Sequence, residues 1–128
     1  MPMGRPTDAE LQILDVLWEC GPATVRQIHD ALRARRGVGY TTILKLLQIM
    51  LVKGLVQRED DARSHVYAAV LKRDKAQRAL VGDLIERAFN GSSAGLAMRA
   101  LSDHPASTAE LDEVEALIAA LRARERRS

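Results

Sequence analysis

The chain has 128 residues, of which 47% are hydrophobic and only 3% aromatic. This composition fits one globular domain, or one domain with a dependent extension, with a core mostly of Leu, Ile, Val and Ala. The net charge of +2 is ordinary, and a single cysteine, Cys20, excludes an internal disulfide and a cysteine-based metal cage. The sequence has no apolar signal region and no run near about 18 apolar residues, so we expect a cytoplasmic protein without direct membrane insertion.

Capping boxes mark where several helices begin. Thr7, Thr24 and Ser107 are each followed three residues later by Glu or Gln, so that the paired side chains can satisfy free backbone N–H groups. The first box predicts a helix from Thr7 to about Cys20, and the second predicts a helix from Thr24 to about Arg35.

A third helix is predicted over residues 40–53, between a glycine-containing turn and the left-handed cap Gly54. With about 100° of rotation per residue, its apolar side chains gather on one side of the helix. The side chains that point away from that side are Thr41, Lys45 and Gln48, with Thr42 and Ile49 on the flanks. Thr, Lys and Gln can bond base edges and phosphates, and the helix has no acidic residue. These features favour a helix that enters the major groove of DNA.

Basic residues are concentrated around this helix. Residues 26–58 contain seven basic residues against Asp30 alone, a local excess of six positive charges. The basic residues are Arg26, Arg33, Arg35, Arg36, Lys45, Lys53 and Arg58. Such a concentration is typical of a phosphate-binding surface, and a solvated helix face is the alternative interpretation.

Two β-prone runs, 55–59 and 64–70, follow around a turn. A β-hairpin directly after a three-helix unit is the order of a winged helix. Arg63 at the hairpin tip is placed to reach phosphate or the minor groove, with His65 close behind it; a salt bridge to Asp60 or Asp61 is the alternative for Arg63. The candidate DNA-contacting residues are therefore Arg26, Tyr40, Thr41, Thr42, Lys45, Gln48, Arg63 and His65.

The chain from residue 72 onward is again helical, in three amphipathic segments before a polar tail at 122–128. These segments are too short to enclose a core alone, so their apolar faces need a partner, and a second copy of the chain is the economical one. The alternative is that they fold back on their own chain, where Ile13 and Val16 are spare apolar residues.

We therefore predict a mainly α fold with a small β-hairpin, divided into a winged-helix DNA-binding domain at 1–71 and a helical dimerisation region at 72–128. The predicted dimerisation residues are Leu80, Leu84, Phe89, Leu96, Leu111, Val114, Leu117, Ile118 and Leu121.

The motifs LDVLW, YTT and KGLV, at these spacings, resemble the penicillinase-repressor family, the BlaI/MecI/CopY group of bacterial transcriptional regulators. The likeness covers nearly the whole chain. It implies a homodimeric repressor that binds palindromic, double-stranded operator DNA through a winged helix, with residues 40–53 as the recognition helix. Thr41, Thr42, Lys45 and Gln48 match the positions of its contacts.

The resemblance also implies a membrane-bound sensor metalloprotease as a partner, because such a protease inactivates members of the beta-lactam branch by cutting an Asn-Phe pair. Here the matching segment reads GLAMRALS, with Arg99-Ala100 at the expected place, and the chain has no Asn-Phe dipeptide. The inducing signal therefore stays open. The copper-responsive branch carries C-terminal cysteines that this chain lacks.

No catalytic site, cofactor or metal is predicted, since the chain has no Gly-rich phosphate loop, His-x-x-x-His pair or nucleophile motif. His29, His65 and His104 fall on different elements. Cys20 is interpreted as a small buried hydrophobe at a helix end, with a redox switch as the alternative. The rival function is a winged-helix protein–protein interaction module without sequence-specific DNA binding, which has no need of a basic, acid-free third helix.

Overall fold

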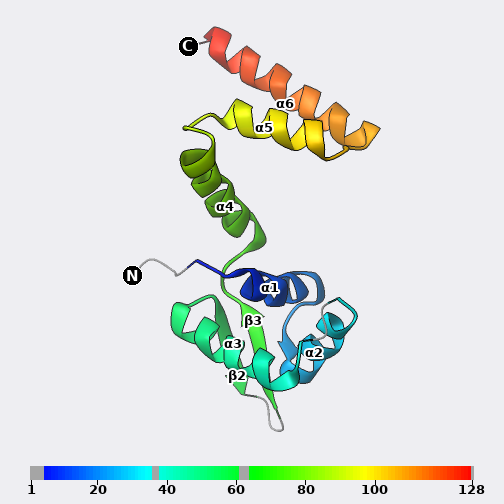
Figure 1. Cartoon of the computed structure of the whole chain (residues 1–128), viewed down its shortest axis with the longest axis vertical. Coiled ribbons are helices and arrows are strands. Elements are labelled where there is room, and N and C mark those ends of the chain that lie inside the picture. The colour runs from blue at the N-terminus through cyan, green and yellow to red at the C-terminus, as the bar shows by residue number, and fades with distance from the viewer. Residues whose placement is uncertain (1–4, 36–37, 61–63, 128) are drawn as a thin grey trace. The chain divides into compact units, whose positions relative to one another are not determined.

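The computed structural model describes residues 5–35, 38–60 and 64–127. The chain is mainly helical with one small antiparallel sheet, which confirms the predicted fold class (Figure 1). The described helices are α1 (Asp8–Cys20), α2 (Val25–Arg33), α3 (Tyr40–Lys53), α4 (Arg73–Ala88), α5 (Ser93–Asp103) and α6 (Thr108–Arg127). The described strands are β1 (Ala23–Thr24), β2 (Val56–Asp60) and β3 (His65–Ala69).

The chain forms two compact units, one up to Leu80 and one from Val81 onward, so the division falls inside α4. The sequence places the functional boundary earlier, between residues 71 and 72. That boundary stays a prediction, because the division into compact units shows only how the chain packs. It does not show which segment binds DNA or a second copy of the chain.

The predicted capping boxes all form. The hydroxyl of Thr7 accepts the backbone N–H of Glu10 at 3.2 Å, and the Glu10 carboxylate accepts the backbone N–H of Thr7 at 2.8 Å. Thr24 with Gln27 and Ser107 with Glu110 repeat the arrangement at 2.9–3.1 Å. The starts of α1, α2 and α6 are therefore fixed by residues only three apart in sequence.

Helix ends are predicted less well. α2 ends at Arg33, two residues before the predicted end, and α6 continues to Arg127 through most of the segment predicted to be a polar tail. The bounds of α3 agree with the prediction. Gly54 closes α3 in the left-handed conformation, with φ 82° and ψ 15°, which glycine adopts without a steric penalty.

The core of the N-terminal unit lies where α1, α2 and α3 pack against the sheet. Its fully buried members are mostly aliphatic, with Tyr67 of β3 among them. Ile13 and Val16 are 0% and 2% exposed, so the interpretation of these two residues as spare was wrong. α1 buries a wider face than one helical stripe because α2, α3 and β3 all contact it.

The sheet has the order β1-β3-β2, and β3 pairs antiparallel with both neighbours. Tyr67 is the central position, opposite Ala23 on one side and Arg58 on the other. The predicted hairpin is confirmed as β2 and β3, whereas β1 was missed, because a strand of two residues carries no alternation pattern. The sheet fixes the hairpin against the helical core through a third strand.

The start of α4 is attached to α1. The indole N–H of Trp18 donates to the carbonyl oxygen of Leu71 at 2.9 Å. The guanidinium of Arg73 lies 5.6 Å from the Trp18 ring centroid and 3.7 Å from a carboxylate oxygen of Asp15. Leu71 and Ala76 are also buried, so the first turn of α4 belongs to the packed N-terminal unit.

The C-terminal helices have little core of their own. No residue of α5 or α6 is buried, and only Ala76 of α4 is. None of the described helices is both long and apolar enough to cross a membrane.

Candidate nucleic-acid interface

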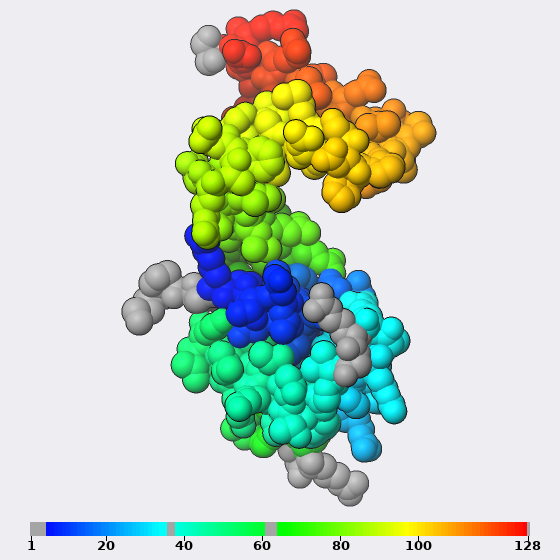
Figure 2. Space-filling view, in the orientation of Figure 1, coloured from blue at the N-terminus to red at the C-terminus, as the bar shows by residue number. Residues whose placement is uncertain are grey.

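The exposed face of α3 carries the predicted contact residues. Ile43, Leu47 and Met50 are completely buried and turn one side of the helix into the core. The opposite side lies on the surface, where the atoms of residues 40–53 appear in teal in Figure 2. The predicted contact residues on this exposed side are Tyr40, Thr41, Thr42, Lys45 and Gln48. Their orientation agrees with the helical spacing, and their contact with DNA remains a prediction.

Several of the basic residues around α3 are held by carboxylates of the same chain. Arg35 lies 2.9 Å from Asp15 and 3.4 Å from Glu19 across to α1. These carboxylates hold the pKa of Arg35 above its ordinary value, chiefly through the hydrogen bond with Asp15. An arginine paired in this way contributes less to the attraction of a phosphate than the sequence count suggests.

Lys53, at the C-terminal end of α3, is also engaged. Its ammonium lies 2.7 Å from the carboxylate of Glu10 and donates to the carbonyl oxygen of Arg5 at 3.3 Å. Burial acts to raise the pKa of Glu10, but hydrogen bonds from Lys53 and Thr7 outweigh burial, so this pKa lies below its ordinary value. The pair joins the start of α1 to the end of α3.

The remaining cations define a smaller basic surface. Arg58 pairs with Asp60 at 3.2 Å, and Arg36 and Arg63 lie outside the described residues. Within the described part of the chain, the exposed cations of residues 26–58 without a carboxylate partner are Arg26, Arg33 and Lys45. These three side chains are available to a phosphate backbone without breaking an internal pair.

A surface hollow brings together predicted residues from three elements. Arg26 comes from the first turn of α2, Tyr40 from the first turn of α3, and His65 from the start of β3. Thr24, Val25, Leu44 and Ser64 complete its lining. Guanidinium, hydroxyl and imidazole groups therefore reach this hollow beside the exposed face of α3, and Val25 and Leu44 give it apolar walls.

The aromatic and imidazole side chains of this hollow are positioned by neighbours. The rings of Tyr40 and His29 meet edge to face, with centroids 6.2 Å apart. The Nδ1 atom of His65 lies 2.7 Å from a carboxylate oxygen of Asp60 across the hairpin. The alternative for Arg63 was a salt bridge to Asp60 or Asp61. Residues 61–63 lie outside the described ranges, so this salt bridge stays a prediction.

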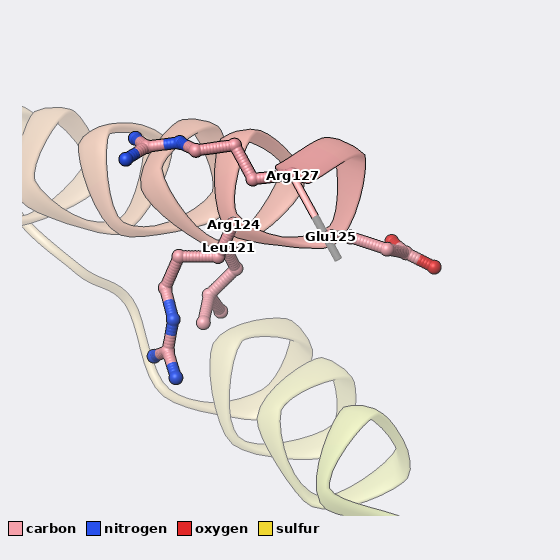
Figure 3. Close-up of a pocket in the computed structure, with 4 residues that line it drawn as sticks. All are labelled: Leu121, Arg124, Glu125 and Arg127. Carbon is pink, nitrogen blue, oxygen red and sulfur yellow. The ribbon is translucent and has the colours of Figure 1, made fainter.

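The predicted dimerisation residues are mostly exposed. Those at least 40% exposed are Leu80, Leu84, Leu111, Leu117, Ile118 and Leu121, and Phe89, Leu96 and Val114 are partly buried. A shallow hollow on α6 is lined by Leu121, Arg124, Glu125 and Arg127, and Figure 3 shows Leu121 and Arg124 on the same side of the helix. One helix supplies all of these residues, so the hollow is an open surface and brings no groups together from different elements.

The thiol and the imidazoles form no common site. Cys20, the last residue of α1, is exposed, so its interpretation as a buried hydrophobe was wrong. Within residues 5–35, 38–60 and 64–127, no group of three or more His, Cys, Asp or Glu side chains is arranged to hold a metal ion.

Comparison with known proteins identifies the family. The family described as "Penicillinase repressor" matches residues 6–120. The chain is 38% identical over 118 residues to proteins described as "Transcriptional regulator BlaI" in two strains of Mycobacterium tuberculosis, over 91% of this chain and 83% of those proteins.

Solved structures agree at the level of the fold. A complex of hsRosR superposes with a TM-score of 0.54 at 25% identity, over 92% of this chain and 90% of that one. A MarR family transcription regulator superposes with a TM-score of 0.53 at 24% identity, over 94% of this chain and 72% of that one. The chain thus belongs to the penicillinase-repressor family, and is a transcriptional regulator with a winged-helix fold.

Proposed function

We propose that the protein is a homodimeric repressor that binds a palindromic operator in double-stranded DNA. The observation that carries this proposal is the exposed face of α3, which presents Thr41, Lys45 and Gln48 without any acidic residue between Tyr40 and Lys53. α3 enters the major groove, where hydroxyl, amide and ammonium groups bond base edges and phosphates.

The hollow beside α3 holds the DNA backbone in this proposal. Arg26 has no carboxylate partner among the described residues, and Tyr40 and His65 add hydrogen-bonding groups next to it. A phosphate placed there would fix the register of α3 in the groove. Arg63, which lies outside the described residues, steadies the wing on the neighbouring backbone in this proposal.

Dimerisation through α4, α5 and α6 completes the proposal. The leucine and isoleucine side chains of α6 are exposed and are not part of a hydrophobic core. A second copy of the chain offers the same apolar face, against which these side chains can be buried. A twofold dimer presents two α3 helices, so the operator half-sites should lie about one or two helical turns of DNA apart.

Release from the operator follows an unidentified signal, with proteolysis by a membrane-bound sensor metalloprotease as the candidate. Such a protease would have to cut a sequence other than Asn-Phe. Arg99 and Ala100, at the matching place, are exposed in α5, and Arg99 lies 3.6 Å from Asp103 one turn later. Cleavage there requires α5 to open locally, because a protease binds its substrate in an extended form.

The salt dependence of DNA binding tests the proposal. If Lys45 neutralises a phosphate in each half-site, Lys45→Ala should weaken binding to all sequences and reduce the slope of log K against log salt by about 0.9 per half-site, or about 1.8 for the dimer. Arg35→Ala is the matched control, since that side chain is already paired with Asp15 and Glu19, and it should leave the slope unchanged.

Binding is best measured by fluorescence anisotropy with a random-sequence duplex and with a duplex selected by the protein itself. A salt slope near zero for the wild-type protein would favour the protein–protein interaction module instead. A slope that is equally steep for the wild type and Lys45→Ala would remove Lys45 from the interface.

A further inference from the structure

The outward side of α3 carries two apolar side chains that the polar contacts do not explain. Ile49 is 44% exposed and Val52 is 90% exposed, and neither belongs to the core or to the residues packed against it. Ile49 lies one turn beyond Lys45, and Thr42 lies one turn before Lys45 on the same side. The exposed face is therefore partly apolar.

Helix stability does not account for these two residues. Ile and Val have poorer helix propensity than Lys, Arg or Gln, and burial adds almost nothing for Val52, which is 90% exposed, and only part of its full value for Ile49, which is 44% exposed. A polar substitution at either position would improve both the helix and its solubility. The apolar group at position 49 therefore fits a contact that forms only when α3 binds its partner.

The position of Ile49 along α3 suits the major groove. At a rise of about 1.5 Å per residue, Ile49 lies about 6 Å from Lys45 and about 10 Å from Thr42 along the helix axis, so it adjoins the polar contact residues on the same face. Val52 lies about 15 Å from Thr42 by the same reckoning, one turn farther toward the end of the helix.

The apolar group that DNA presents in the major groove is the C5-methyl of thymine. We propose that Ile49 contacts a thymine methyl group in each operator half-site and so contributes to sequence specificity. The ammonium of Lys45 and the amide of Gln48 bond polar base edges and gain nothing from a methyl group, whereas Thr41 and Thr42 offer one methyl group each and Ile49 offers a larger apolar surface. This inference rests on the proposed function, because it assumes that α3 enters the groove.

Replacement of thymine by deoxyuridine tests the contact, since it removes the methyl group and leaves base pairing intact. The probe is a duplex selected from random-sequence DNA by the wild-type protein, with each thymine replaced in turn. For the wild type, loss of one buried methyl should weaken binding about fourfold per half-site, or about 16-fold when both half-sites are changed. Binding is measured by anisotropy at fixed salt.

Ile49→Ala should bind the unmodified operator more weakly and lose its sensitivity to deoxyuridine at the same position. Val52→Ala, which removes a more exposed side chain from the same face, should keep the wild-type sensitivity. Because both positions are exposed, circular dichroism should show unchanged folding for both variants.

Equal deoxyuridine sensitivity of the wild type and Ile49→Ala at every position would overturn the inference while leaving the proposed function intact. A change in the sedimentation coefficient of Ile49→Ala would also overturn it, because a second copy would then cover Ile49. If the wild type selects no sequence from random DNA, the proposed function fails, and the inference fails with it.

Discussion

The ion pair between Glu10 and Lys53 gives the sharpest test of how α3 is held in place. The carboxylate of Glu10 has a side-chain exposure of only 2%, and Lys53 is 27% exposed. In the variant Glu10→Gln, the amide can still accept the backbone N–H of Thr7, as Gln27 does for Thr24 at the start of α2. The variant therefore removes the charge from the pair and keeps the cap.

The expected loss of unfolding free energy is about 1.5 kcal/mol, the lower end of the range for hydrogen bonds to charged groups, because Lys53 is partly solvated. For a unit of this size, that loss lowers the melting temperature by about 6–12 °C. Trp18 is the only tryptophan and lies in the N-terminal unit, so its fluorescence reports the unfolding of this unit.

The pH dependence adds a second criterion. The pKa of Glu10 is lower in the folded state, so its contribution is present above the unfolded pKa of about 4.3 and is lost as the pH falls through the folded value. The stability difference between wild type and Glu10→Gln should thus shrink below about pH 4. Equal melting temperatures at pH 7, or a difference that stays constant on acidification, would refute the reasoning. Lys53→Met should give a similar loss that is not additive with Glu10→Gln.

Two further variants test the dimer and the end of α3. Leu117→Asp should produce monomers in sedimentation equilibrium and weaken operator binding, because each half-site is then bound independently; Ala116→Asp, on the opposite side of α6, is the control. A persistent dimer would contradict dimerisation through this face. Gly54→Ala should cost about 1–2 kcal/mol, because alanine is strained at φ 82°. Gly39→Ala, at φ −72° with open space, should change the Trp18-monitored melting less.

Local signals in the sequence predicted the helical part of the fold well. The starts of α1 and α6 follow from side chains three residues away, and the bounds of α3 follow from flanking glycines. β1 could not be predicted in this way. Its two residues form a strand only because Tyr67 and Val66, more than 40 positions later, lie beside them.

The sequence predicted which face of α3 is exposed, but it did not predict which of the surrounding basic residues are paired with carboxylates. A count of charges treats Arg35, Lys53 and Arg58 as available, whereas each is paired with a carboxylate. The partners of Arg35 and Lys53 lie on α1, 16 to 43 residues away in sequence. Only the packing of α1 against α2 and α3 brings these charges together, so no local pattern reveals them.

The strand order has a consequence for folding during synthesis. β3 is the central strand and the last of the three to be made, so β1 has no partner until residues 65–69 have left the ribosome. Ribosomes add about 5–20 residues per second, so the apolar side chains of α1 to α3 that pack against the sheet stay exposed to solvent for seconds. The nascent N-terminal unit completes its sheet in a single late step, when β3 inserts between two strands already synthesised.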